Sequence, residues 1–274
     1  MYIKSTNLNL KQIADSGQCF RMNEISKGRY SLIALGEYVE LLQVDENRIR
    51  ILGASRDRRK QWEEYFDLQH DYNALVNKLL ECEDEFLRRA AAFGSGLRIL
   101  RQEPFEMLIS FIISQNKNIP AIKSAVEKLC KKFGEEKRWS EDPNVVYYTF
   151  PAPERLATAE KDDLRALGLG YRDEYVLQAA RAVAEGRLDL HELKRMDYEQ
   201  IIEELMTLRG VGKKVANCVA LFAFHRLHSI PVDVWIARVL DEIYEGNFSW
   251  EPYGDQAGIV QQYMFYYIRN CKQL

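Results

Sequence analysis

Residues 205–218 read LMTLRGVGKKVANC, and the short segment IPVDVW follows at residues 230–235. Apolar residues recur at helical spacing on both sides of the glycine turn, so residues 199–224 are predicted to form a helical hairpin. Gly210 and Gly212 allow positive φ and leave backbone N–H groups uncovered where the second helix starts. A helix start of this kind binds anions, and phosphate is the obvious guest.

The first helix is predicted to end at Leu208 and the second to begin near Lys213. A nucleotide-binding loop is excluded, because it needs glycine where Thr207 stands and serine or threonine where Lys214 stands. An ordinary helical hairpin with glycine turns remains the alternative to a phosphate site. The turn alone does not decide between them.

Lys214 is the candidate nucleophile of this segment. It falls in the first turn of the second helix, where the helix dipole and the charge of Lys213 both disfavour the ammonium form. Burial beside Val215 and Cys218 would lower the pKa of the amine further, and a lysine attacks only when neutral. The alternative is that both lysines are solvated phosphate contacts.

Asp233 is the candidate partner of Lys214. It stands two residues after Pro231 and just before an apolar helix, so it is predicted to cap that helix. Backbone N–H bonds keep a carboxylate ionised, and a fixed carboxylate stabilises an oxocarbenium-like transition state. A cap with no other role is the alternative.

The rest of the chain predicts an α+β protein with two domains. Short β-prone runs at 29–35, 37–44 and 48–52 predict a small antiparallel sheet inside a mixed N-terminal domain, residues 1–95. Beyond that, helical periodicity dominates, which predicts a larger all-helical domain over residues 96–274.

Composition narrows the class of protein. The chain has 274 residues, no apolar run of about 18 residues and no secretory signal at its N-terminus, so we expect an intracellular, cytoplasmic protein without a membrane partner. The cysteines are odd in number and widely spaced, which indicates reduced thiols and argues against structural zinc or a four-cysteine cluster. We expect no metal and no cofactor. The five cysteines are Cys19, Cys82, Cys130, Cys218 and Cys271.

Charge is distributed unevenly along the chain. The formal net charge is -3, yet the stretch 205–228 holds Arg209, Lys213, Lys214 and Arg226 and no acidic residue. A local basic face is enough for contact with nucleic acid, since only that face meets phosphate. A chance fluctuation in charge explains the stretch equally well.

Several motifs in the same order resemble a known family. The hairpin and IPVDVW are accompanied by SGQCFRM at 16–22, GLRILRQEPFEMLISFIISQNKNI at 96–119, LGLGYRDEYV at 167–176 and AGIVQQYMF at 257–265. Together they resemble the helix-hairpin-helix DNA glycosylases with a catalytic lysine, and the whole chain resembles the 8-oxoguanine DNA glycosylase/AP lyases, nearest to a bacterial subgroup. Double-stranded DNA containing 8-oxoguanine is the implied partner, and a monomer is the simplest expectation.

The resemblance implies a role for each matching residue in catalysis. Lys214 matches the nucleophile that attacks C1′, expels 8-oxoguanine and forms a Schiff base, after which β-elimination cleaves the strand. Asp233 matches the essential aspartate. Gly210, Gly212 and Lys213 match the hairpin that contacts phosphate.

The resemblance also implies how the base is recognised. Gly17 matches the glycine whose carbonyl accepts the N7 proton that guanine lacks. Cys218 and Phe265 match the residues that sandwich the flipped base, and Gln261 matches the reader of its Watson–Crick edge. Read without the family, Cys218 and Phe265 are ordinary core positions.

Asn116, Tyr171 and Arg172 match the residues that fill the vacated space and contact the orphaned cytosine. Without the resemblance, Asn116 reads as part of a helix cap and Arg172 as solvent-exposed. Two positions depart from the vertebrate-type pattern: Ala121 stands where a second arginine contacts the cytosine, and Trp235 where a histidine lies near phosphate. We therefore expect relaxed preference for the opposite base.

Two other functions remain open at this point. One is a non-catalytic hairpin protein that binds DNA as a scaffold, which would form no covalent intermediate. The other is a glycosylase for a different damaged base. The absence of cluster cysteines disfavours the endonuclease III branch, and the presence of Lys214 disfavours the monofunctional branch.

Overall fold

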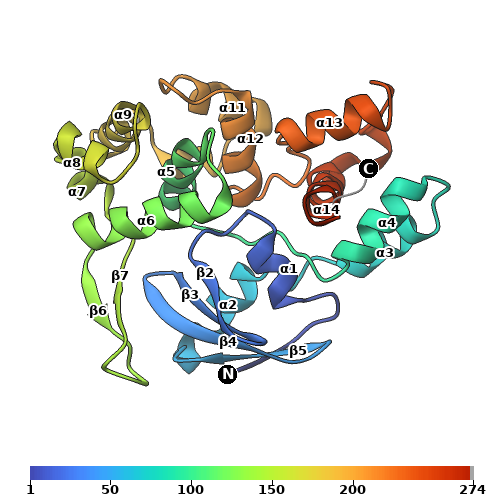
Figure 1. Ribbon diagram of the computed structural model, residues 1–274, viewed down its shortest axis with the longest axis horizontal. Helices are drawn as coiled ribbons and strands as arrows, with labels where there is room; N and C mark the ends of the chain where they lie inside the picture. The colour runs from blue at the N-terminus through green and yellow to red at the C-terminus, as the bar shows by residue number, and fades with distance from the viewer. Residues whose placement is uncertain (272–274) are drawn as a thin grey trace.

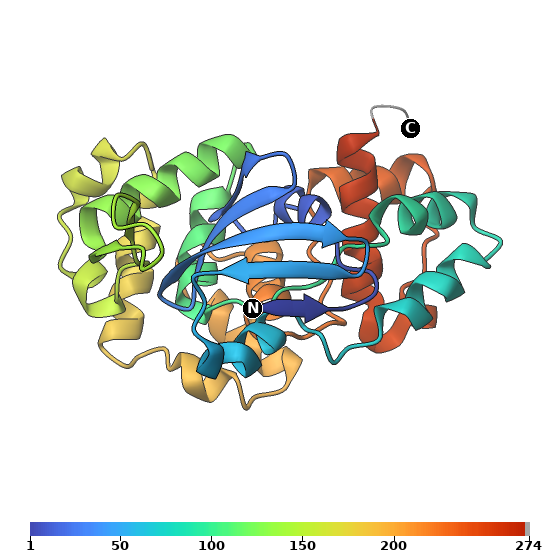
Figure 2. The ribbon, with the colours of Figure 1, turned by 90° about the horizontal axis from the view of Figure 1, so that it is seen from below.

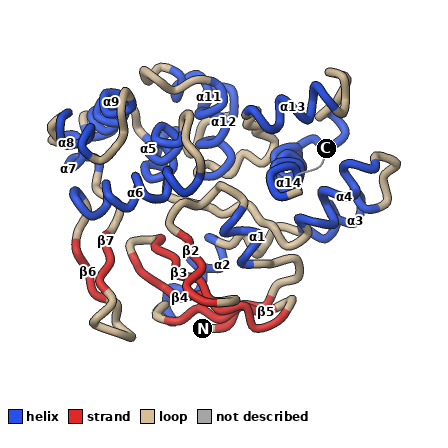
Figure 3. The backbone as a smooth tube through the Cα atoms, in the orientation of Figure 1, coloured by secondary structure: helices blue, strands red, loops and turns tan. Residues whose placement is uncertain are grey.

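The computed structural model describes residues 1–271, and its N-terminal part is built on one antiparallel sheet. The strand order is β1-β5-β4-β3-β2, and every neighbouring pair is antiparallel (Figure 1; Figure 3, red). The central three strands confirm the predicted sheet, whereas the two edge strands were not predicted. The strands are β1 (Tyr2–Lys4), β2 (Met22–Ser26), β3 (Arg29–Ala34), β4 (Glu37–Asp45) and β5 (Arg48–Leu52).

One face of this sheet is buried. Alternate residues of the strands point inward, such as Leu32 and Ile49, and they pack with the buried Ile13 and Trp62 from two helices. This alternation is what a half-buried strand requires. The packing helices are α1 (Leu10–Asp15) and α2 (Arg59–Tyr65), the latter preceded by the 3-10 turn η1 (Arg56–Arg58). From below, the sheet crosses in front of the helical body, with the N-terminus at its edge (Figure 2).

The remaining helices enclose the larger core, with the apolar α5 at its centre. Every residue of α5 from Glu106 to Ser114 is buried. The helices are α3 (Tyr72–Leu80), α4 (Glu85–Gly94), α5 (Pro104–Ser114), α6 (Ile119–Phe133), α7 (Pro153–Ala157), α8 (Lys161–Ala166), α9 (Arg172–Ala184), α10 (Leu190–Leu193), α11 (Tyr198–Met206), α12 (Lys213–Phe222), α13 (Val234–Glu242) and α14 (Ala257–Asn270), with the 3-10 turn η2 (Glu251–Gln256) before the last.

Two details differ from the sequence-based expectations. The first hairpin helix ends at Met206 rather than Leu208, with Thr207 as its C-cap. The helical part also carries a two-stranded hairpin, β6 (Glu136–Arg138) and β7 (Val146–Tyr148). It extends toward the sheet (Figure 1), where Trp139 packs edge-to-face on Tyr38 with ring centroids 5.1 Å apart.

The buried residues form two hydrophobic cores, and the division between these cores does not coincide with the predicted domain boundary after residue 95. Helices α3 and α4 precede that position, yet Leu75 and Leu87 belong to the larger core, and α4 packs against α14. Leu100, which follows it, belongs to the core of the sheet. The packing therefore joins α3 and α4 to the helical part, and the predicted boundary remains a description of the sequence pattern alone.

Candidate active site

The hairpin turn holds its backbone in a conformation that only glycine accommodates. Gly210 has φ +84, and a Cβ added there would lie 2.3 Å from Cδ2 of Tyr175. Its carbonyl accepts a hydrogen bond of 3.0 Å from Nε2 of Gln115. Gly212 is the exposed N-cap of α12, with open space around it, and Lys213 is exposed beside it. The uncovered helix start predicted from the sequence is therefore present.

Lys214 lies half-buried in the first turn of α12. Its Nζ is 5.4 Å from the ring centroid of Phe111 on α5, within cation–π range. Phe111 in turn packs edge-to-face on Phe20, with centroids 5.4 Å apart. The rings of Phe111 and Phe20 therefore form an aromatic floor on one side of the Lys214 amine.

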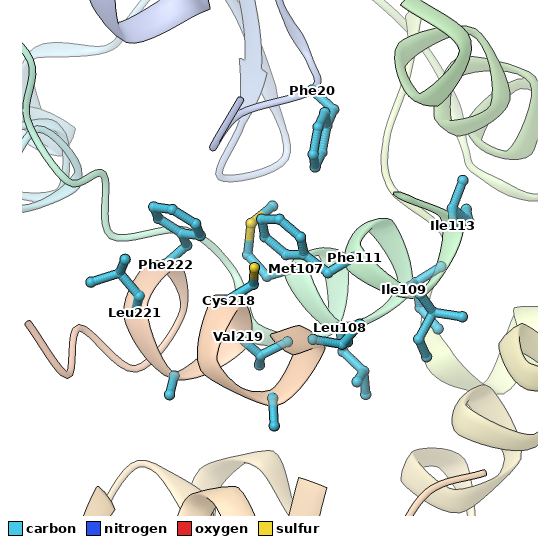
Figure 4. Packing of buried hydrophobic residues seen from close by; sticks show 14 of the residues in the cluster. Phe20, Met107, Leu108, Ile109, Phe111, Ile113, Cys218, Val219, Leu221 and Phe222 are labelled. Carbon is cyan, nitrogen blue, oxygen red and sulfur yellow. The ribbon is translucent and has the colours of Figure 1, made fainter. Parts of the chain in front are cut away.

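Cys218 follows Lys214 by one helical turn and is 3% exposed. Figure 4 shows it directed toward Met107 and Phe111 of α5. Burial raises the pKa of the Cys218 thiol, the charge of Lys214 lowers it in part, and the charge of Asp233 raises it. The Cys218 thiol is thus within electrostatic range of both Lys214 and Asp233, two side chains 19 positions apart in sequence.

Asp233 caps α13, as the sequence predicts. Its Oδ1 accepts hydrogen bonds from the backbone N–H groups of Trp235, at 3.1 Å, and Ile236, at 3.0 Å. Within residues 1–271, Oδ2 of Asp233 has no hydrogen-bond partner, so one oxygen fixes the side chain while the other can face a ligand.

Asn217 is a site residue that the sequence reasoning missed. It is 2% exposed, and its Oδ1 accepts from Tyr198 Oη at 2.8 Å, Ser229 Oγ at 2.8 Å and Ile230 N at 3.2 Å. Its Nδ2 donates to the Lys213 carbonyl at 2.8 Å. Asn217 therefore ties the start of α12 to the segment leading to Asp233. The available signal was a single amide inside the apolar run VANCVALF.

The structure also brings together two of the four predicted base contacts, Gly17 and Phe265, from opposite ends of the chain. Gly17 has φ +76, and a Cβ added there would lie 3.3 Å from Cε1 of Phe265 and 3.0 Å from Cδ1 of Ile119. Phe265 is half-buried on α14. Gly17 and the Phe265 ring are therefore close neighbours, although they come from opposite ends of the chain.

Gln261, which is predicted to contact the Watson–Crick edge of the base, is buried and hydrogen-bonded to protein groups. The side chain is 2% exposed, its Nε2 donates to the Pro231 carbonyl at 2.9 Å, and its Oε1 accepts from Gln262 Nε2 at 2.8 Å. Both ends of the amide are thus engaged by protein. The bond to Pro231 also holds the segment before Asp233 against α14.

Asn116 and Tyr171, two of the residues predicted to fill the space that the flipped base leaves, meet at the surface and are called the wedge below. Nδ2 of Asn116 donates to the Tyr171 hydroxyl at 3.0 Å, and Tyr171 is 50% exposed. Asn116 has φ +51, a left-handed conformation that asparagine tolerates better than most residues. Asn118, two residues later, caps α6 by accepting from the Ala121 N–H at 2.9 Å.

Arg172 is buried, so the solvent-exposed reading of this residue is wrong. It is 6% exposed, and its Nε donates to the Gln115 carbonyl at 2.7 Å while its Nη1 donates to the Leu169 carbonyl at 3.1 Å. Its guanidinium carbon lies 4.4 Å from the Tyr171 ring centroid. Arg172 therefore supports Tyr171 and the residues before Asn116, and its predicted contact with cytosine remains a prediction.

The two positions that depart from the vertebrate-type pattern lie in helix starts. Ala121 is in the first turn of α6, and Trp235 is in the first turn of α13 with 38% of its surface exposed. Val234, beside Trp235, is 78% exposed. Apolar surface therefore borders the capping carboxylate of Asp233 on its solvent side.

Within residues 1–271, no three histidine, cysteine or acidic side chains lie close enough to bind a metal ion together. The same residues contain no helix that is both long and apolar enough to cross a membrane.

Two family models match consecutive parts of the chain. Residues 1–108 match the model described as 8-oxoguanine DNA glycosylase, N-terminal domain, and residues 109–248 match the model described as HhH-GPD superfamily base excision DNA repair protein. A probable N-glycosylase/DNA lyase of Methanothermobacter thermautotrophicus is 32% identical over 241 residues, which cover 77% of this chain and 75% of the relative. An N-glycosylase/DNA lyase of Saccharomyces cerevisiae is 30% identical over 267 residues, covering 89% and 70%.

Solved structures share the whole fold. A structure of MBOgg1 in complex with a low affinity DNA ligand superposes with a TM-score of 0.93 at 35% identity, covering 99% of this chain and 96% of that one. The Clostridium acetobutylicum 8-oxoguanine glycosylase/lyase, bound to double-stranded DNA with cytosine opposite 8-oxoguanine, superposes with a TM-score of 0.91 at 32% identity. That match covers 100% of this chain and 99% of the Clostridium chain.

Proposed function

Because the chain belongs to the HhH-GPD superfamily of base excision DNA repair proteins, we propose that it excises 8-oxoguanine from double-stranded DNA and then cleaves the strand. The observation that carries the proposal is the position of Lys214 beside the Phe111 ring at the start of α12, which Asn217 ties to the segment leading to Asp233. An amine over an aromatic floor and a fixed carboxylate are the two groups that a glycosidic displacement requires.

The proposed reaction uses these two groups in sequence. Neutral Lys214 Nζ attacks C1′, the C1′–N9 bond breaks, and the departing purine takes the bonding electrons and a proton. The Asp233 carboxylate stabilises the positive charge that develops on the sugar. Opening of the sugar ring converts the adduct to an imine, and loss of a C2′ proton then expels the 3′ phosphate. The strand is cut without water as the nucleophile.

Base recognition completes the proposal. The Gly17 carbonyl accepts the N7 proton, Phe265 stacks on the flipped base, and Cys218 closes the opposite side. Gln261 reads the base edge with the second N–H and the second oxygen lone pair of its amide, which the bonds to Pro231 and Gln262 leave over. A single hydrogen bond discriminates strongly when its absence leaves a buried polar group unpaired. Base extrusion costs a few kcal/mol, which stacking offsets.

The proposal extends to the contacts with DNA, the opposite-base preference, the oligomeric state and the cellular location. Gly210, Gly212 and Lys213 contact phosphate, and Asn116, Tyr171 and Arg172 occupy the space opposite the lesion. The opposite-base preference is relaxed because Ala121 offers no donor. The protein belongs to the bacterial subgroup, acts as a monomer and works in the cytoplasm, which the similarity to the Clostridium chain supports for the subgroup.

The test compares neighbouring lysines on one substrate. Wild-type protein and the Lys214→Gln and Lys213→Gln variants are incubated, at saturating enzyme, with a duplex containing one 8-oxoguanine, and free base and cut strand are quantified. Wild type and Lys213→Gln are expected to release the base, and Lys214→Gln is expected to release none. Binding without release by wild type would instead indicate the non-catalytic scaffold. Release of only another damaged base, such as an alkylated purine, would indicate the other glycosylase class.

A further inference from the structure

Arg269 lies one helical turn after Phe265, near the C-terminal end of α14, and the mechanism above gives it no role. Its guanidinium carbon is 5.3 Å from the centroid of the Phe265 ring. Its Nη1 donates to the carbonyl of Asp15, the last residue of α1, at 3.3 Å. One side chain therefore touches both the C-terminal helix and the N-terminal segment, 254 positions apart.

The same guanidinium borders Gly17. A Cβ added at Gly17 would lie 3.6 Å from Arg269 Nη1, close to its 3.3 Å distance from Phe265 Cε1. Gly17, Phe265 and Arg269 thus form one contact group, in which Arg269 is the member bonded to the backbone just before Gly17. An arginine at a helix C-terminus is favoured by the dipole alone, but the dipole does not require this stack or this carbonyl.

The surroundings of Arg269 hold it in this arrangement. It is half-buried, and burial lowers the pKa of the guanidinium, which the charges of Asp15 and Asp233 partly oppose. Asp233 is therefore within electrostatic range, which places Arg269 at the edge of the candidate active site. A planar guanidinium can stack on a ring and donate in its own plane at once, whereas an ammonium cannot.

We propose that Arg269 is a positioning residue that fixes the Phe265 ring against the Gly17 carbonyl, and so sets the recognition of 8-oxoguanine. This inference rests on the proposed function. The carbonyl and the ring come from opposite ends of the chain, and the base must fit both at once. Arg269 holds their separation by stacking on one and bonding to the segment that carries the other.

The test separates base recognition from the lyase chemistry. Arg269→Leu and Arg269→Lys are compared with Arg89→Leu, which removes an exposed helical arginine of α4 whose ion-pair partner among residues 1–271 is Glu85 alone. Single-turnover rates are measured on two duplexes, one with 8-oxoguanine opposite cytosine and one with an abasic site opposite cytosine. The abasic substrate needs Lys214 but presents no base to Gly17 or Phe265.

We expect Arg269→Leu to slow 8-oxoguanine excision by on the order of 10- to 100-fold, since small misplacements of reacting groups cost this much. Cleavage at the abasic site is expected to change by less than about 2-fold, because no base has to be aligned there. Arg269→Lys is expected to lose excision in the same selective way, because a lysine cannot stack and donate together. Arg89→Leu is expected to match wild type on both substrates.

Two outcomes would overturn the inference. One is wild-type excision by Arg269→Leu. The other is a parallel loss on both duplexes, accompanied by a lower melting temperature, which would mark a purely structural residue. Neither result touches the proposed function, which fails only if the wild-type protein itself releases no 8-oxoguanine.

Discussion

The two sides of the candidate site are built differently. On the base side, Gly17, Phe265 and Asp233 come from distant segments, and within residues 1–271 neither the Gly17 carbonyl nor Oδ2 of Asp233 has a hydrogen-bond partner. On the opposite-strand side, Arg172 is buried and donates to backbone carbonyls, so Tyr171 and Asn116 are the exposed predicted groups there.

This difference indicates which of the two bases, the damaged one or its partner, the protein recognises more strictly. A rigid base pocket discriminates through contacts that are made or lost as a unit. An exposed ring and amide fill space but offer little readout of base edges. We therefore expect strict recognition of the damaged base and loose recognition of its partner, and four changes test that contrast.

The largest effect is expected from Asp233→Asn. Asparagine caps helices as well as aspartate does, so the melting temperature should stay near that of wild type. Loss of the carboxylate charge should reduce base excision on the order of 100- to 1000-fold, as removal of one electrostatic stabiliser does. Single-turnover excision and thermal melting measure the two effects. Wild-type excision by the variant would reduce Asp233 to a cap.

Gly17→Ala should act on the base side alone. Gly17 has φ +76, and the new methyl group would lie 3.0 Å from Ile119 and 3.3 Å from Phe265. We expect excision of 8-oxoguanine to fall on the order of 10- to 100-fold through misplacement of the carbonyl and ring, while abasic-site cleavage persists. Equal losses on both substrates would show that the methyl group disturbs more than the base wall.

Ala121→Arg should tighten the opposite-strand side. The change introduces a forked donor in the first turn of α6, and a good bidentate contact gives about 1 to 3 kcal/mol of base discrimination. Excision rates are measured opposite all four bases, with Ala121→Met as a control of similar length without charge. Cytosine preference should rise only in the arginine variant. A wild-type protein that already cleaves opposite cytosine alone would contradict the relaxed preference.

The smallest effect is expected from Asn118→Ala. The Asn118 side chain caps α6 just after the wedge, and loss of such a cap costs about 1 kcal/mol of unfolding free energy. Denaturant unfolding measures that loss. Excision of 8-oxoguanine should change much less than in Gly17→Ala, because the cap bond runs to the Ala121 N–H and not to Gly17 or Phe265. A large loss of excision would show that the base side depends on the opposite-strand side, which contradicts the proposed difference between them.

The sequence predicted those helices and strands whose apolar residues recur with a regular period. Strands β3 to β5 alternate, and α5, α12 and α14 carry apolar stripes, so periodicity found them. The three-residue strands β1, β6 and β7 have no period to detect. Trp139 fixes the β6–β7 hairpin through Tyr38, a partner far away in sequence.

From the residues alone, the candidate site was predictable only where a local pattern carried the information; the roles of Gly17, Gln261 and Phe265 came from the family resemblance. The cap of Asp233 and the glycine turn at Gly210 are local, and the structure confirms both. The burial of Arg172 and the hydrogen bonds of Asn217 depend on carbonyls and hydroxyls that folding brings near. No spacing in the sequence encodes them, so they emerged only from the packed structure.

The central claim is that the amine of Lys214 forms a covalent bond to the sugar. Borohydride is added while the protein acts on a duplex with one 8-oxoguanine, and the reduced adduct is digested and mapped by mass spectrometry. We predict a single trapped peptide modified at Lys214, absent in Lys214→Gln and present in Lys213→Gln. Release of 8-oxoguanine by the wild-type protein without any trapped adduct, or an adduct on another residue, would contradict the account.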